Sequence, residues 1–157
     1  MSVRAAHWGP RRRGALIAHD NRQRDLRDWV RSNRDELAGH ELLATGPAAS
    51  ALAGEFALAV ARFRRDPLGD ERAPTSGTAA RPVDFLIFFW DPRQPNPADP
   101  DVRALLRLAV VWDVPIACTR ASADLMLSSH RAGDLHARRL PPMDERRWYP
   151  ELAVALA

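Results

Sequence analysis

Short apolar runs alternate along this chain with amphipathic or polar segments, which is the pattern of a mostly parallel sheet covered by helices. The clearest run, residues 83–89, is apolar apart from Asp84 at its start, as expected for a strand buried on both faces in the centre of such a sheet. The other runs that we expect to form strands are residues 14–18, 42–44, 56–60 and 114–118. The pattern therefore predicts an α/β domain with a mostly parallel five-stranded sheet.

Helical spacing is present between the expected strands. Residues 20–38 place Leu26, Trp29 and Val30 on one face, and Asp20 is positioned to cap that helix. Further helices are expected in an Ala-rich segment ending at Ala53 and over residues 101–112 and 121–128. The proline-rich residues 64–82 and 92–100 are expected to be loops.

The 157 residues have the length of one domain. We expect residues 14–129 to form it, residues 1–13 to be a disordered basic N-terminus, and residues 130–157 to be a C-terminal tail or interface segment. The longest apolar run, residues 85–90, is far shorter than the roughly 20 residues of a membrane-spanning helix. With no signal-peptide core and a single cysteine, Cys118, the sequence predicts a cytoplasmic protein that does not bind membranes.

The distribution of charge along the sequence argues against nucleic acid as a partner. All 23 basic residues are arginines, and they are interspersed with 20 acidic residues to give a formal net charge of +3. A nucleic-acid surface usually has a basic stripe interleaved with aromatic side chains, and the sequence has none, so nucleic acid is not an expected partner. The histidines lack the spacing of metal ligands, so no metal is expected either.

Polar residues follow every expected strand. In a parallel α/β sheet, ligands bind in the crevice outside the carboxyl ends of the strands. The residues at these ends are His19 and Asp20, Thr45 and Gly46, residues 64–66, Asp91, and Thr119 with Arg120. Such a set suits a site for an anionic small molecule with acid–base chemistry, although strand ends in any α/β protein also turn polar where they meet solvent.

Several of these positions lie in motifs that resemble the methylglyoxal synthase family. The motifs are LIAHD at 16–20, ATG at 44–46, PLG at 67–69, DFLIFFWDP at 84–92, DPDVRALLRLAVVWDVPIA at 99–117 and ASAD at 121–124. The resemblance implies a three-layer α/β domain that assembles as a homohexamer. It also implies conversion of dihydroxyacetone phosphate, a small phosphorylated metabolite, into methylglyoxal and inorganic phosphate with no cofactor.

The resemblance assigns roles to individual residues. Four of them, His19, Thr45, Gly46 and Arg107, would bind the substrate. Three carboxylates, Asp20, Asp91 and Asp101, would shape the acidic floor of the site. The catalytic aspartate of the family falls on Glu71, which would act as the base, with Asp70 beside it as the alternative. We expect His19, Thr45, Glu71 and Asp91 to converge on one crevice.

The chain also departs from the family where the chemistry would occur. Gln23 replaces a lysine, Pro47 and Ala48 replace two threonines, Arg65 and Asp66 alter a glycine-containing loop, and Ala98 replaces a histidine. Lost hydroxyl and cationic groups weaken phosphate binding unless Arg22, Arg24, Arg64 or Arg65 supplies the positive charge. Two alternatives to full family activity therefore stay open: a weakened or altered lyase, and a noncatalytic module that binds an anion or phosphometabolite.

Overall fold

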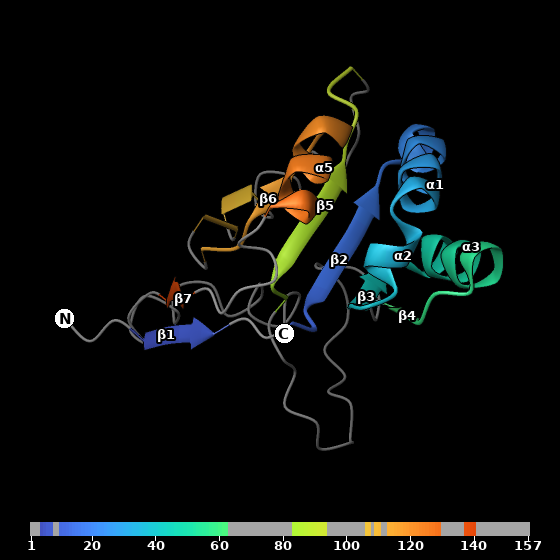
Figure 1. The fold of residues 1–157 in the computed structure, drawn as a ribbon. Helices are drawn as coiled ribbons and strands as arrows, with labels where there is room; N and C mark the ends of the chain where they lie inside the picture. Colours follow the sequence, from blue (N-terminus) through green and yellow to red (C-terminus); the bar gives the residue numbers. More distant parts are fainter. Residues whose placement is uncertain are drawn as a thin grey trace, which may run out of the picture.

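The computed structural model describes residues 4–7, 10–62, 83–93, 106–107, 109–110, 113–129 and 137–140. Its centre is a five-stranded sheet in the order β4-β3-β2-β5-β6, in which every neighbouring pair is parallel. The strands are β2 (Arg13–Ala18), β3 (Glu41–Ala44), β4 (Val60–Arg62), β5 (Phe85–Phe89) and β6 (Ile116–Ala117) (Figure 1). This arrangement confirms the predicted α/β class and the parallel sheet.

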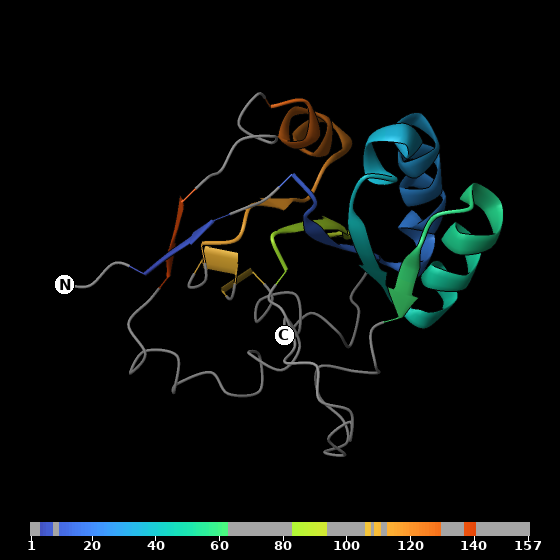
Figure 2. The ribbon, with the colours of Figure 1, turned by 60° about the horizontal axis from the view of Figure 1, so that its bottom comes forward.

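Most of the helices cover one face of the sheet. After β2 come the 3-10 helix η1 (Asp20–Arg22), α1 (Gln23–Ser32) and α2 (Arg34–Leu37), and later α3 (Gly46–Phe56) and α5 (Arg120–Ser128). Figure 2 shows α1, α3 and α5 together on the same side of the strands. The Trp29 indole N–H donates to the Asp124 carboxylate across 2.9 Å, which links α1 to α5.

The sheet has a hydrophobic core on each face. The larger core lies under α1, α3 and α5 and includes Leu16, Trp29 and Phe89. The smaller core on the opposite face contains Leu86 and Ala109, and the helical residues 106–107 and 109–110 lie on that side. Helical residues thus lie on both faces of the sheet, which agrees with the expected three layers.

Two expectations for the elements were wrong. The helix expected over 20–38 is divided into η1, α1 and α2, and Asp20 is the first residue of η1 rather than a cap. The strand expected over 56–60 begins only at Val60, because α3 extends to Phe56 and ends on Ala57 in the left-handed conformation (φ 52°). The apolar Phe56, which suggested a strand, is instead the last residue of the helix, and its side chain packs in the larger core.

A separate antiparallel pair joins residues 4–7 to residues 137–140. Strand β1 (Arg4–His7) pairs with β7 (Ala137–Leu140), with Arg4 opposite Leu140 and His7 opposite Ala137. Residues 4–7 therefore differ from the disorder expected for residues 1–13, and residues 137–140 are extended within the expected C-terminal tail. The expected loops at 64–82 and 94–100 lie outside the described residues.

Candidate active site

The two central strands bring His19 and Asp91 together at the carboxyl edge of the sheet. Strands β2 and β5 are paired in register, with Ala18 opposite Phe89, so the residues that follow them are neighbours. The His19 backbone N–H donates to the Phe89 carbonyl across 3.0 Å. The Asp91 backbone N–H in turn donates to Nδ1 of His19 across 3.1 Å. These contacts place His19 and Asp91 side by side at this edge of the sheet.

The hydrogen bond to Nδ1 determines which nitrogen of His19 can donate. An imidazole nitrogen that accepts a hydrogen bond carries no proton, so the neutral ring has its proton on Nε2. The ring is held edge-on against Phe88, with 5.5 Å between ring centroids and 76° between planes. His19 is therefore oriented as a hydrogen-bond donor through Nε2, which suits an oxygen that gains negative charge during a reaction.

Both carboxylate oxygens of Asp91 are hydrogen-bonded. The Arg93 backbone N–H donates to Oδ1 across 2.9 Å, and the Asn21 side-chain amide donates to Oδ2. The Arg93 hydrogen bond is the main cause that holds the pKa of Asp91 below its ordinary value, and the Asn21 amide and the charges of Arg93 and Arg22 act in the same direction. Asp91 is thus an ionised carboxylate at neutral pH. Asn21 was not among the residues expected in the site, and its only signal in the sequence is its place beside His19 and Asp20 after a central strand.

Thr45 and Gly46 directly follow β3, at the same edge of the sheet as His19. The register pairs Ala44 with Leu16 of the neighbouring strand β2, so Thr45 follows β3 on the side where His19 follows β2. Thr45 is the N-cap residue of α3, but its hydroxyl makes no capping hydrogen bond. The first N–H groups of a helix have no partner within the helix and carry partial positive charge. The start of α3 can therefore hold an anion.

Three of the residues that depart from the family pattern, Gln23, Pro47 and Ala48, lie in the described part of the chain. The Gln23 side-chain amide donates to the carbonyl of Ala18, the last residue of β2, across 2.7 Å, so this donor already has a partner within the protein. Ala48 is only 3% exposed and belongs to the larger core, where a threonine would have to bury its hydroxyl. Pro47 lies in the first turn of α3 and has no N–H to offer.

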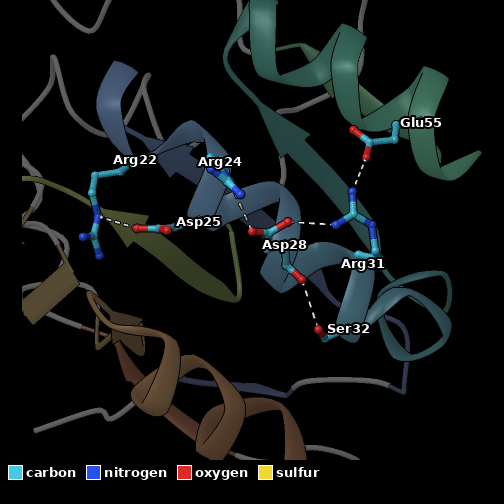
Figure 3. Close-up of polar contacts among 7 residues, drawn as sticks. All are labelled: Arg22, Arg24, Asp25, Asp28, Arg31, Ser32 and Glu55. Carbon is cyan, nitrogen blue, oxygen red and sulfur yellow. Dashed lines mark hydrogen bonds and ion pairs between the residues drawn. The ribbon is translucent and has the colours of Figure 1, made fainter.

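The arginines near the start of α1 have different surroundings. The Nε of Arg22 lies 3.1 Å from the Asp25 carboxylate, and the Arg22 charge contributes to the low pKa of Asp91. Arg24 has an 88% exposed side chain, and its Nε lies 4.0 Å from Asp28, one turn further along the helix. Figure 3 shows these two ion pairs at separate places on α1. Of these two arginines, Arg22 is the one whose charge acts on Asp91.

Of the remaining predicted site residues, the structure describes only Asp20 and Arg107. Asp20 is exposed in η1, next to His19 in the chain. Arg107 is exposed, and within the described part of the chain no hydrogen bond or ion pair joins it to His19 or Asp91. Several residues of the expected site lie outside the described residues: Arg64, Arg65, Asp66, Asp70, Glu71, Ala98 and Asp101. Their roles stay predictions.

The described residues offer neither a cluster of metal ligands nor a helix that could cross a membrane. Among the residues that the structure describes, no group of three or more His, Cys, Asp or Glu side chains could hold a metal ion. Within the same part of the chain, no helix is long and apolar enough to cross a membrane.

Comparison with known proteins assigns the family. The chain is 43% identical over 141 residues to methylglyoxal synthase of Saccharophagus degradans, covering 90% of this chain and 92% of that protein. It is 47% identical over 118 residues to methylglyoxal synthase of Leptospira interrogans, covering 75% of this chain and 80% of that relative.

A solved structure agrees with these relatives. The crystal structure of methylglyoxal synthase from Elizabethkingia anophelis NUHP1 matches with a TM-score of 0.76 and 36% sequence identity, over 92% of this chain and 95% of that one. No protein-family model matches the chain. The identity and coverage of these relatives, together with the matching fold, show that the chain belongs to the methylglyoxal synthase family.

Proposed function

We propose that this protein converts dihydroxyacetone phosphate into methylglyoxal and inorganic phosphate. The observation that carries the proposal is the hydrogen bond from the Asp91 backbone to Nδ1 of His19, which leaves Nε2–H as a donor at the edge of the sheet. Membership of the methylglyoxal synthase family supplies the substrate and the reaction.

The reaction needs a base and an oxygen-stabilising donor. A carboxylate removes a proton from the hydroxymethyl carbon beside the carbonyl, and negative charge develops on the carbonyl oxygen as an enediolate forms. The Nε2–H of His19 donates to that oxygen. The former carbonyl oxygen then takes up a proton, while the hydroxyl on the deprotonated carbon loses its proton and becomes an aldehyde oxygen. This electron shift breaks the bond between the other carbon and the phosphate oxygen and releases inorganic phosphate. The resulting enol takes a proton on its terminal carbon to become methylglyoxal. By its position in the family motif, Glu71 is the proposed base.

The phosphate binds at the start of α3. The Thr45 hydroxyl and the N–H groups of Gly46 and Ala48 are the donors that this turn offers, and the partial positive charge of the helix N-terminus favours an anion. Because Gln23 is occupied at the Ala18 carbonyl, we assign the cationic role to Arg22, whose charge already acts on Asp91. This pair of assignments explains how the site binds phosphate without a lysine.

Assembly and location are part of the same proposal. We propose a homohexamer in the cytoplasm that works without a metal or an organic cofactor, as the family resemblance implies. Val110 and Leu125 have exposed fractions of 79% and 73%, and contacts between copies would remove such large apolar side chains from water. Sedimentation of the purified protein at micromolar concentration tests the assembly, and a monomer would contradict it.

The test of the activity is direct. Purified protein is incubated with dihydroxyacetone phosphate, and phosphate and methylglyoxal are measured in the same samples. The proposal predicts equal amounts of both products, formed in proportion to the enzyme concentration. Binding of dihydroxyacetone phosphate by calorimetry without either product would instead identify the noncatalytic module.

A further inference from the structure

Asn21 joins the segment after β2 to the segment after β5. Its side-chain amide donates to Oδ2 of Asp91, which is 70 residues away in the sequence. We propose that Asn21 is a positioning residue for the reaction: it holds the Asp91 carboxylate in place, and the Asp91 backbone N–H then keeps His19 in its Nε2–H form. The catalytic meaning of this inference rests on the proposed function, whereas its structural part does not.

The local structure explains why this contact matters. The helix η1 has only three residues, none of them buried, and no side chain caps its start. Apolar packing therefore cannot determine where it lies relative to β5. The Arg22 backbone N–H donates to the His19 carbonyl at 2.8 Å, and the Arg22 side chain pairs with Asp25 of α1. Among the described residues, Asn21 is the member of η1 whose side chain has a hydrogen bond to the segment after β5.

The Asp91 carboxylate lies between the two groups that the inference connects. Oδ1 accepts the Arg93 backbone N–H, two residues further along, which folds the chain back on itself at this point. Oδ2 accepts the Asn21 amide, so the carboxylate is held from both sides and cannot rotate freely. The backbone N–H of the same residue donates to His19 Nδ1 at 3.1 Å, and its direction depends on this fold.

The lack of charge on Asn21 matters for the site as much as its hydrogen bond to Asp91 does. An amide donates to the Asp91 carboxylate without cancelling its charge, so Asp91 keeps its negative charge beside His19. An aspartate at position 21 would have nearly the same shape but would put two carboxylates in contact, which disfavours the ionised pair. The substitution Asn21→Asp therefore changes the chemistry of this contact with little change in volume.

The chain offers a matched control in Asn33. This residue ends α1, and its side-chain amide donates to the Asp124 carboxylate across 3.3 Å. The Asn33–Asp124 contact is of the same chemical kind as the Asn21–Asp91 contact. It joins the end of α1 to α5, and neither residue is hydrogen-bonded to His19 or Asp91. The substitution Asn33→Asp makes the same chemical change outside the proposed site.

The experiment compares Asn21→Ala, Asn21→Asp and Asn33→Asp with the wild type. Long-range proton–nitrogen NMR spectra report which imidazole nitrogen of His19 is protonated, and a His19→Ala sample assigns its signals among the five histidines. The inference predicts a single Nε2–H form in the wild type and in Asn33→Asp, and a mixture of both tautomers in the two Asn21 variants. It also predicts that Asn21→Ala lowers kcat about tenfold with little change in KM, and that Asn21→Asp lowers it further.

Two results would overturn the inference. The first is an unchanged His19 tautomer in both Asn21 variants. The second is a tautomer change of equal size in Asn33→Asp, because it would show a general loosening of the fold. A wild type that forms no product would contradict the proposed function, but the NMR comparison would still decide the structural role of Asn21.

Discussion

Nδ1 of His19 accepts the backbone N–H of Asp91 across 3.1 Å, although the two residues are 72 positions apart in the sequence. This bond exists because β2 and β5 are adjacent and parallel, so the first residues beyond their ends meet. It makes the orientation of a ring in one segment depend on the backbone of another. The predictions for the site follow from this relationship.

Removing the His19 ring should impair catalysis rather than folding. The ring is partly exposed and stands at the end of the sheet, so His19→Ala should keep the wild-type circular dichroism spectrum. Loss of one donor to a developing oxyanion typically costs about 10²–10³ in kcat, and we expect a loss of that order. Steady-state kinetics with dihydroxyacetone phosphate measure it, and a wild-type kcat would show that Nε2 does not touch the reacting oxygen.

Replacing Arg22 should weaken binding of the substrate. Its charge acts on Asp91, whereas Arg24 is 88% exposed and lies beside Asp28 on the outer part of α1. We expect Arg22→Gln to raise the KM for dihydroxyacetone phosphate about tenfold, as for one lost hydrogen bond to a charged group, and Arg24→Gln to leave it unchanged. Equal effects of the two substitutions would show that the overall charge, not the position, matters.

Gly14 should not tolerate a side chain. It lies in β2 directly opposite Phe85 in β5, and an added Cβ would come within 2.1 Å of Cζ of that ring. We expect Gly14→Ala to lower the free energy of unfolding by about 1–3 kcal/mol in urea denaturation. Gly54 in α3 is the control, since a Cβ there meets nothing within 4 Å and should stabilise the helix by about 0.5–1 kcal/mol. A destabilised Gly54→Ala would contradict this packing.

The buried His40 should make the fold sensitive to acid. Its Nδ1 accepts the Arg12 backbone N–H at 3.4 Å, and its ring packs edge-on against Phe85. Burial, and then the charge of Arg12, lower the pKa of His40 from its ordinary value of 6.5. Below that pH the unfolded chain binds a proton that the folded state resists, so stability is lost as the pH falls.

The substitution His40→Asn separates this effect from other acid effects. Asparagine keeps an acceptor near the position of Nδ1 but does not titrate. The free energy of unfolding of the wild type should therefore fall more steeply between about pH 7 and pH 5 than that of the variant. Parallel pH dependences for the two proteins would show that His40 is not the titrating group.

The strand-end rule predicted part of the site because it depends only on strand order and direction. Residues 83–89 are apolar on both faces apart from Asp84, which favours a central strand, so Asp91 was expected near His19 at the carboxyl edge of a parallel sheet. The end of α3 was harder to predict. Phe56 and Leu58 are both buried and spaced as in a strand, and the left-handed Ala57 between them has no signal in the sequence.

Side-chain direction is the part that the sequence could not supply. Arg22 and Arg24 are the same residue type, two positions apart in the sequence. Only the structure shows that the charge of Arg22 acts on Asp91 while Arg24 pairs with Asp28. Asn21 looked like an ordinary turn residue, because its role depends on a contact with a residue 70 positions away. Hydrogen bonds of this kind follow from the fold and leave no local pattern.

The most direct test of the central claim is phosphate release from dihydroxyacetone phosphate by the wild type, Glu71→Gln and Asp70→Asn side by side. We predict release by the wild type, a loss of about 10²–10⁴ in rate for Glu71→Gln, and near-normal release for Asp70→Asn. A larger loss in Asp70→Asn than in Glu71→Gln would move the base by one residue. No release above background by a folded wild type would contradict the claim that this protein is a lyase.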